Sequence, residues 1–136
     1  ALAEGDERRA IDNIMTRLRS LVEETGAGLI LVSHLRRVDG NKGHENGVEV
    51  SLSHLRGSNS IGQLSDCVIA LERNQQSEDD LESRTTKLRI LKSRYTGDVG
   101  MATSLVYDKD TGRLAEYSDA ELLGEEETLL PELLWI

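Results

Sequence analysis

Apolar residues near the start of the chain recur at intervals of three and four positions. They are Ile11, Ile14, Met15, Leu18, Leu21 and Val22. Because this spacing forms one apolar stripe on a helix, we predict an amphipathic helix over residues 6–25, with Asp6 as its N-cap and Gly26 as its C-terminal stop. The continuous apolar run at residues 29–32 is typical of a strand buried on both faces of a parallel sheet. A helix followed by a buried strand predicts an α/β fold.

The pattern changes in the second half of the chain. Residues 58–66 favour a short helix, and the apolar residues 68–71 favour a second buried strand. Residues 87–94 alternate between apolar and charged side chains, which is typical of an edge strand or the arm of a hairpin. Residues 103–107 and 113–117 flank a turn that contains glycine, and therefore predict a hairpin. We expect parallel strands with flanking helices, followed by antiparallel hairpin strands.

Polar stretches separate these elements. Residues 38–53 are rich in glycine, asparagine and charge. Because long loops inside compact domains usually serve a function, we interpret this one as a candidate contact surface. Residues 74–83 are polar and acidic and predict an exposed loop. Beyond residue 117 the chain is acidic and rich in leucine, so we divide it into one domain, residues 1–117, and an acidic tail, residues 118–136.

The charge of the chain is unevenly distributed. The formal net charge is −9, but seven acidic residues and no lysine or arginine follow Arg113. The rest of the chain carries 18 acidic and 16 basic side chains. This part is nearly balanced, so the total charge does not exclude a nucleic-acid partner. Aromatic residues make up only 3% of the chain, which argues against binding of single strands by stacking and favours contacts through basic and amide groups.

Composition also indicates a compartment. No apolar run approaches the roughly 20 residues that a helix needs to cross a bilayer, and we expect no membrane insertion. The chain begins at Ala1 without a basic and then apolar leader, so we expect no signal peptide and interpret the sequence as part of a longer protein. The single cysteine, Cys67, lies in an apolar stretch and is expected to be buried and reduced, in keeping with the cytoplasm.

Two polar motifs are candidates for phosphate contacts. His34 follows the strand predicted at residues 29–32, at the end of the sheet where doubly wound α/β folds bind ligands. A hydrogen-bonded histidine without a ligand is the alternative. The segment 55–66 combines Arg56 and Gly57 with small polar side chains, which suits contact with a phosphodiester backbone through amide donors. An ordinary cap between a loop and a helix would show the same pattern.

A pair of cations precedes a glycine-rich turn. Lys92 and Arg94 lie on the same side of the predicted strand, and Gly97 and Gly100 permit a tight bend after them. A planar guanidinium on a projecting turn suits a phosphate supplied by another subunit, which is the role of an arginine finger. A solvated strand end is the alternative interpretation.

Arg73 and Tyr107 end two separate predicted strands. If the fold brings them together, a guanidinium and a phenol ring would enclose a nucleobase. If it does not, both are residues of an exposed rim. The sequence alone does not place one relative to the other.

Taken together, these motifs resemble the C-terminal half of the RecA-like motor domain of the hexameric replicative DNA helicases, which include the phage primase-helicases, Twinkle and the DnaB-like proteins. The resemblance extends over about residues 6–117. The segments that carry it are GDERR at 5–9, HL at 34–35, LRGS at 55–58, QLSD at 63–66, ALERNQQ at 70–76 and the Lys-x-Arg-x-x-Gly-x-x-Gly run at 92–100. The combination and order of these segments are specific to that family.

The resemblance implies a role for each motif. His34 would sense the γ-phosphate, and Lys92 and Arg94 would serve the phosphate of a neighbouring subunit. Arg73 and Tyr107 would enclose the nucleobase. The residues implied to contact single-stranded DNA are Arg36, Arg37 and Lys42 in the central-channel loop and Arg56, Gly57 and Gln63 in the second motif. The family further implies ATP or another nucleoside triphosphate with Mg²⁺, a hexameric ring, and an acidic tail that docks a replicative polymerase.

The chain also departs from the family. It contains no Gly-x-x-x-x-Gly-Lys-Ser/Thr phosphate loop, and the catalytic glutamate and acidic magnesium-binding strand that the family implies are absent, so we expect this part alone to be inactive. Its tail has acidic residues at 125–127 but ends in an apolar stretch. The leading interpretation is part of an ATP-dependent replicative DNA helicase. The alternatives are a RecA-like recombinase, a clock-type ATPase and a non-enzymatic replisome adaptor.

Overall fold

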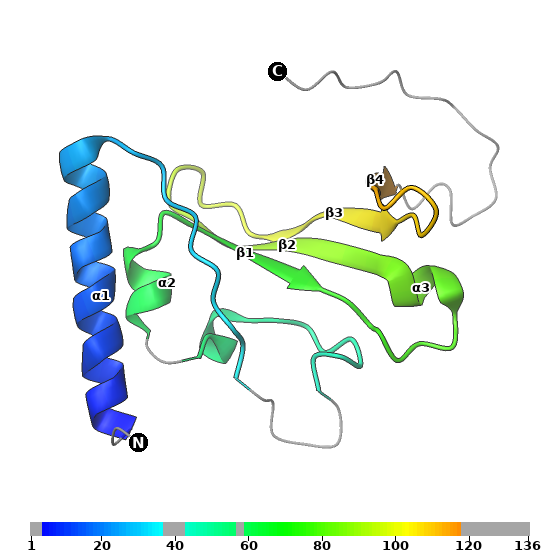
Figure 1. The fold of residues 1–136 in the computed structure, drawn as a ribbon, viewed down its shortest axis with the longest axis horizontal. Helices are drawn as coiled ribbons and strands as arrows, with labels where there is room; N and C mark the ends of the chain where they lie inside the picture. The colour runs from blue at the N-terminus through cyan, green and yellow to red at the C-terminus, as the bar shows by residue number, and fades with distance from the viewer. Residues whose placement is uncertain (1–3, 37–42, 57–58, 118–136) are drawn as a thin grey trace.

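A four-stranded antiparallel sheet, in the order β1-β2-β3-β4, forms the centre of the computed structural model (Figure 1). The structure describes residues 4–36, 43–56 and 59–117. The strands are β1 (Cys67–Glu72), β2 (Thr85–Ser93), β3 (Gly100–Tyr107) and β4 (Leu114–Tyr117). The helices are α1 (Glu4–Thr25), the 3-10 helix η1 (Leu52–His54), α2 (Ser60–Leu64) and α3 (Asp80–Arg84). In this part of the chain, none of the helices has the length and apolar character needed to cross a membrane.

Helix α1 confirms the predicted amphipathic helix and ends where expected. Gly26 has a φ of 67°, and its N–H donates to the carbonyl of Val22 at 2.9 Å. Glycine suits this position because a side chain disfavours the left-handed conformation that closes a helix. The start differs from the prediction, because Asp6 lies inside the helix. The helix packs against α2 and buries Met15 (Figure 1).

The prediction of parallel strands is wrong for the described residues, because every strand pair in the sheet is antiparallel. The strand expected at residues 68–71 is present as β1, but it lies at the edge of the sheet beside β2. For the next strand to pair with β1 in parallel, the connection must run back along the whole length of β1. A strand of six residues is about 20 Å long. Helix α3, with five residues, is only about 7.5 Å long. The connection therefore reverses the chain.

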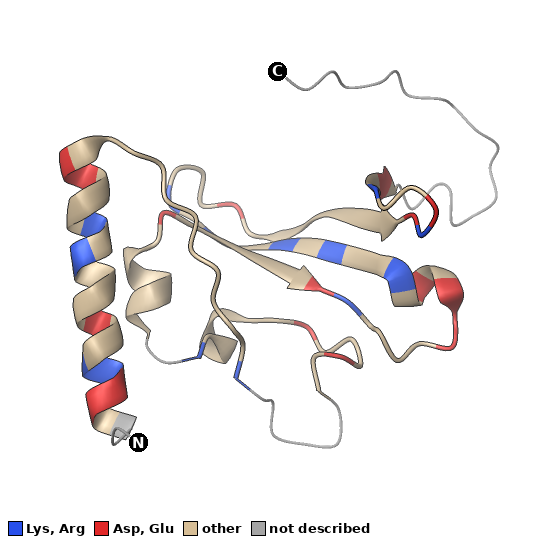
Figure 2. Ribbon diagram, viewed as in Figure 1, with Lys and Arg blue, Asp and Glu red and all other residues tan. Residues whose placement is uncertain are grey.

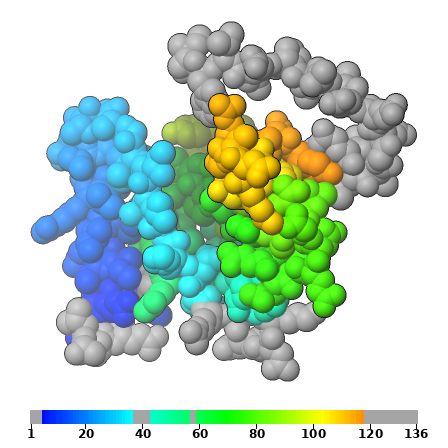
Figure 3. All heavy atoms as spheres, turned by 45° about the vertical axis from the view of Figure 1, so that its right-hand side comes forward, coloured from blue at the N-terminus to red at the C-terminus, as the bar shows by residue number. Residues whose placement is uncertain are grey.

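The strand predicted at residues 29–32 is not formed. Ile30 and Val32 are 94% and 85% exposed, because the described residues place no strand alongside this segment. Figure 3 shows the segment after α1, in cyan, running over the surface between α1 and the sheet. The first pairing of this part of the chain comes later, where Leu35 forms an antiparallel bridge with Leu55.

The two faces of β1 differ. Ala70 and Glu72 are buried, whereas Cys67, Ile69 and Leu71 are exposed. The expectation of a buried Cys67 is wrong, because alternate residues of a strand point to opposite faces and Cys67 lies on the outer one.

The C-terminal half of the sheet follows the sequence pattern. The hairpin predicted at 103–107 and 113–117 is present as β3 and β4. The strand predicted at 87–94 is present as β2 and forms a hairpin arm with β3. It lies between β1 and β3 and is not an edge strand. Its charged positions are accommodated because Arg89 pairs with the buried Glu72 and Lys92 with main-chain carbonyls.

The loop predicted at residues 38–53 returns to the sheet at Glu72. The N–H of Val50 donates to Oε1 of Glu72 at 2.8 Å, and Nε of Arg89 donates to the same oxygen at 2.9 Å. This hydrogen bond from Arg89 raises the pKa of its guanidinium. Val50 and Glu72 are 3% and 8% exposed. The end of the candidate contact loop is therefore fixed to β1 and β2.

Candidate functional site

A groove of about 640 Å³ lies between the start of α1, the segment that ends at Arg36, and α2. It brings together three of the predicted DNA-binding residues, Arg36, Arg56 and Gln63. Figure 2 shows basic positions on α1, at the end of the segment that follows it and beside η1. The residues that line it are Glu7, Arg8, Asp12, Arg36, Ser53, Leu55, Arg56, Asn59, Ser60 and Gln63. The other three predicted residues, Arg37, Lys42 and Gly57, lie outside the described residues.

Pairing between two short segments places Arg36 and Arg56 diagonally across one bridge, with Arg36 opposite His54 and Arg56 opposite His34. Leu35 and Leu55 form an antiparallel bridge, and the N–H of Arg36 donates to the carbonyl of His54 at 2.9 Å. The neighbours of a bridged residue point to the opposite face from that residue. The two leucines are half-buried, and Arg36 and Arg56 are exposed on the other face. Main-chain pairing thus sets the spacing of the Cα atoms from which the two arginine side chains extend.

The groove is weakly basic. Arg8, Arg36 and Arg56 line it together with two acidic residues, Glu7 and Asp12. Guanidinium groups bind phosphate oxygens through paired N–H donors, and the amide of Gln63 adds a further donor. The groove can therefore hold a phosphodiester backbone, with contacts that do not depend on the base sequence.

His34 is exposed and lies next to this groove along the chain. Its carbonyl accepts a hydrogen bond from the N–H of Arg56 at 3.1 Å. The residue predicted to sense a phosphate is therefore joined through the main chain to the second DNA-binding motif.

Lys92 and Arg94 both extend toward the C-terminal end of α2. Nζ of Lys92 donates to the carbonyls of Gly62 at 2.7 Å and Gln63 at 2.9 Å. Nη2 of Arg94 donates to the carbonyl of Gln63 at 3.3 Å, and its Nη1 pairs with Oδ1 of Asp66 at 2.9 Å. These cations satisfy carbonyls that have no partner within the helix, which is favourable at a helix C-terminus. The two predicted phosphate-binding cations thus share one partner element.

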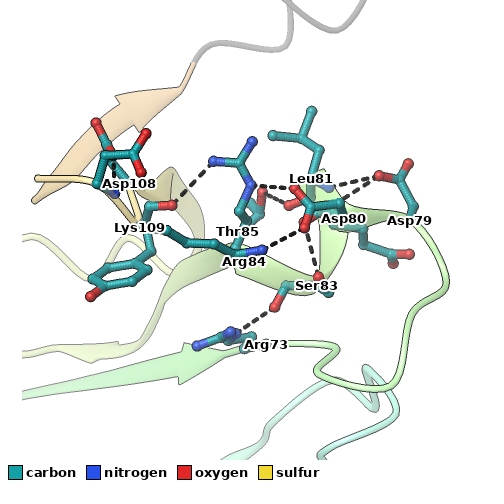
Figure 4. Close-up of polar contacts among 12 residues, drawn as sticks. Arg73, Asp79, Asp80, Leu81, Ser83, Arg84, Thr85, Asp108 and Lys109 are labelled. Atoms are coloured by element: carbon teal, nitrogen blue, oxygen red, sulfur yellow. Dashed lines mark hydrogen bonds and ion pairs between the residues drawn. The ribbon is translucent and has the colours of Figure 1, made fainter. Parts of the chain in front are cut away.

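The sheet brings Arg73 and Tyr107 to the same end, at the ends of β1 and β3. Nε of Arg73 donates to the carbonyl of Ser83 at 2.6 Å, and Nη1 of Arg84 donates to the carbonyl of Tyr107 at 3.2 Å (Figure 4). Each residue is therefore linked to α3. Arg73 also lines a groove of about 330 Å³ that includes Tyr117. The enclosure of a base by Arg73 and Tyr107 stays a prediction.

Helix α3 is fixed by its own acidic residues. Asp79 caps it by accepting hydrogen bonds from the N–H groups of Leu81 and Glu82. Asp80 pairs with Lys109 at 2.7 Å and with Arg84 at 2.8 Å (Figure 4). These hydrogen bonds, the one from Lys109 above all, lower the pKa of Asp80. The cluster connects α3 with the turn between β3 and β4.

The described residues do not include a set of metal ligands. In residues 4–36, 43–56 and 59–117, no group of three or more His, Cys, Asp and Glu side chains is arranged to hold a metal ion.

Three residues of these sites lie in segments that carry the family resemblance but were not predicted as site residues. Arg8 belongs to the polar face of α1, and only the packing of α1 on α2 places it in the groove. Asp66 and Glu72 meet their arginine partners across 17 to 47 positions of sequence. A carboxylate directly before or at the end of an apolar strand was the available signal, as in QLSD at residues 63–66.

The fold and the grooves describe an α/β domain with a weakly basic groove, and comparison with known proteins gives its class. Residues 2–116 match the DnaB-like helicase C-terminal domain, so the chain belongs to that family. Among individual proteins, it is 42% identical over 128 residues to the DNA helicase/primase of Enterobacteria phage T3. That alignment covers 94% of this chain and 22% of the relative, so the chain spans about a fifth of the relative's length. The resemblance to the replicative helicases is confirmed.

Proposed function

We propose that this chain is the C-terminal part of the motor of a replicative DNA helicase, which moves on single-stranded DNA by hydrolysing ATP or another nucleoside triphosphate. The observation that carries the proposal is the convergence of Arg36, Arg56 and Gln63 in one groove, within a chain of the DnaB-like helicase family. The naming of the phage T3 relative as a helicase/primase favours this function over a recombinase, a clock-type ATPase or an adaptor.

The DNA strand is proposed to lie in the groove. Arg36 and Arg56 bind successive phosphates, and the amide of Gln63 binds a third oxygen or a sugar. The bridge between Leu35 and Leu55 joins the segments that carry Arg36 and Arg56. A shift of either segment is therefore proposed to move both arginines together. His34 belongs to this paired unit, so a displacement caused by a γ-phosphate reaches the DNA contacts through the main chain.

Lys92 and Arg94 are proposed to act on a nucleotide held by a neighbouring subunit. A guanidinium stabilises the negative charge that develops on a phosphoryl group in transfer. Both cations are bonded to the end of α2 in the isolated chain, and they would exchange these carbonyls for phosphate oxygens at a subunit interface. This role requires a homo-oligomer, for which we propose a hexameric ring. Arg73 and Tyr107 are proposed to contact the base, and residues 118–136, outside the described residues, to dock a polymerase.

The test is strand separation by the full-length protein. We expect it to unwind a forked DNA duplex with a hydrolysable nucleoside triphosphate and not with a non-hydrolysable analogue. The double variant Arg36→Ala/Arg56→Ala should retain its oligomeric state and lose single-strand binding and unwinding. A protein that hydrolyses nucleotide in a ring but neither binds nor unwinds DNA would contradict the helicase assignment. A protein without hydrolysis that binds a polymerase would support the adaptor alternative.

A further inference from the structure

We propose that Asp66 is the positioning residue for Arg94, holding its guanidinium group ready for the phosphate of a neighbouring subunit. The proposal rests on the function proposed for Arg94. It concerns a carboxylate in the connection between α2 and β1, which is the last residue of the QLSD motif and to which the motif analysis gives no role.

Asp66 holds Arg94 through both its side chain and its main chain. Oδ1 of Asp66 accepts Nη1 of Arg94 at 2.9 Å, and the carbonyl of Asp66 accepts the main-chain N–H of Arg94 at 2.8 Å. The main-chain bond extends the pairing of β1 with β2 by one step and fixes where the side chain begins. The ion pair then fixes where the guanidinium ends. Both ends of a long, flexible side chain are therefore held by one residue.

The carboxylate of Asp66 has a second cationic partner, Arg19 of α1. Its second oxygen, Oδ2, accepts Nη1 of Arg19 from α1 at 2.8 Å. Arg19 also pairs with Glu23 one turn further along α1 at 2.7 Å. These hydrogen bonds, first from Glu23 and then from Asp66, raise the pKa of Arg19, so it stays charged. The two oxygens of Asp66 therefore have separate partners, so the contact with α1 can be removed while the pair with Arg94 remains.

The two cations of the candidate phosphate site differ in their partners. Lys92 is bound by the neutral carbonyls of Gly62 and Gln63. Arg94 has one such carbonyl at the longer distance of 3.3 Å and depends on the charged oxygen of Asp66. Hydrogen bonds to an ionised acceptor are the stronger kind. Loss of the Asp66 charge should therefore affect Arg94 more than Lys92.

The ion pair between Arg94 and Asp66 orders the side chain of Arg94 but is weak enough to be broken. The side chains of Arg94 and Asp66 are 43% and 30% exposed, and ion pairs at such exposure are weak in water. A phosphoryl group with two or more negative charges can therefore draw the guanidinium away. An ordered side chain loses less freedom when it binds, and this loss is the main cost of using a flexible arginine in a transition state. Asp66 reduces this cost and still allows the guanidinium of Arg94 to move to the phosphate.

The test compares Asp66→Asn with Arg19→Ala and Arg94→Ala in the full-length protein with single-stranded DNA. Asp66→Asn keeps the size of the side chain and removes its charge. Arg19→Ala is the matched control, because it removes the other partner of the same carboxylate and leaves the pair with Arg94. The measurements are kcat and KM for nucleotide hydrolysis, nucleotide affinity, Tm and oligomeric state.

For Asp66→Asn we expect kcat to fall by about tenfold or more, toward the 10²-fold cost of a catalytic group misplaced by about 1 Å. KM, Tm and oligomeric state should stay close to those of the unmodified protein. Arg19→Ala should keep its kcat. If Asp66→Asn keeps full kcat while Arg94→Ala is inactive, the positioning role is wrong and the function of Arg94 stands. A loss of kcat in Arg19→Ala equal to that in Asp66→Asn would mean that Asp66 only holds α1. If Arg94→Ala keeps its hydrolysis, the proposed function itself fails.

Discussion

The N–H of Arg56 donates to the carbonyl of His34 at 3.1 Å. These residues are 22 positions apart in the sequence, and they belong to different motifs, one proposed to sense phosphate and the other to bind DNA. The hydrogen bond is one of two that flank the bridge between Leu35 and Leu55. A paired unit of this kind moves as one body, which gives a physical route between the two sites.

Replacement of His34 should weaken the link between DNA binding and hydrolysis. In His34→Ala, we expect the ratio of nucleotide hydrolysis with and without single-stranded DNA to fall by about fivefold or more, the usual lower range of coupling between sites. His54→Ala is the matched control, since it removes a histidine from the same paired unit that is not a predicted phosphate sensor. The ring of His54 accepts the N–H of Ser51 and lies 5.0 Å from the ring of His44. A ratio that is lowered equally in both variants would contradict a specific role for His34.

Removal of the groove arginines should change the salt dependence of DNA binding. Each phosphate contact with a single strand contributes about 0.7 to the slope of log K against log salt. In Arg36→Ala and in Arg56→Ala, we therefore expect the slope to fall by about 0.7. Arg17→Ala, which removes an exposed arginine of α1 that does not line the groove, should leave it unchanged. The measurement is a titration of labelled oligonucleotide at several salt concentrations. Equal slopes in all three variants would exclude the groove as the binding site for single-stranded DNA.

The buried carboxylate of Glu72 should be needed for stability. It accepts hydrogen bonds from Val50 and Arg89, and an amide in its place keeps one acceptor oxygen but loses the charge that pairs with Arg89. We expect Glu72→Gln to lower the free energy of unfolding by about 2 kcal/mol, seen as a lower Tm in thermal unfolding. Glu49→Gln is the control, because Glu49 pairs with the same arginine at 3.3 Å while its side chain is 70% exposed. An unchanged Tm in Glu72→Gln would show that the loop is held by other contacts.

The cluster around α3 should depend on pH through Asp80. Lys109 and Arg84 lower its pKa in the folded state, so the unfolded chain binds the proton more readily. The contribution of Asp80 to stability is therefore present above its unfolded pKa of about 4 and is lost as the pH falls through the lower folded value. The protection factor of the α3 amides, which allows for the intrinsic pH dependence of hydrogen exchange, should fall in this range. In Asp80→Asn it should already be lower at neutral pH and should change less with acid. A steeper response to acid in Asp80→Asn than in the unmodified protein would contradict the predicted direction of this pH dependence.

The local elements could be predicted from the sequence. The stripe of apolar residues and Gly26 located α1 and its end, and the alternation of residues 103–107 and 113–117 located the β3–β4 hairpin. These signals depend on neighbours in sequence. The direction of strand pairing does not, and residues 29–32 have the composition of a buried strand although Ile30 is 94% exposed. Burial of such a run depends on which strand lies beside it.

The site could be predicted only in part, for the same reason. Arg56 and Gln63 lie in a motif with a recognisable composition, and Arg36 follows His34 closely. Arg8 enters the groove because α1 packs on α2, and Asp66 meets Arg94 because β1 pairs with β2. No periodicity within either segment encodes these contacts. They follow from pairing between parts of the chain that are distant in sequence.

The central claim is that this chain supplies Arg94 to a nucleotide in a neighbouring subunit of a DNA-stimulated motor. The most direct measurement is nucleotide hydrolysis by the full-length Arg94→Ala protein with single-stranded DNA, together with its nucleotide affinity. We predict that hydrolysis falls by about 10³-fold, the lower range for an arginine finger, while nucleotide affinity and ring assembly are nearly unchanged. Undiminished DNA-stimulated hydrolysis in Arg94→Ala would contradict the account.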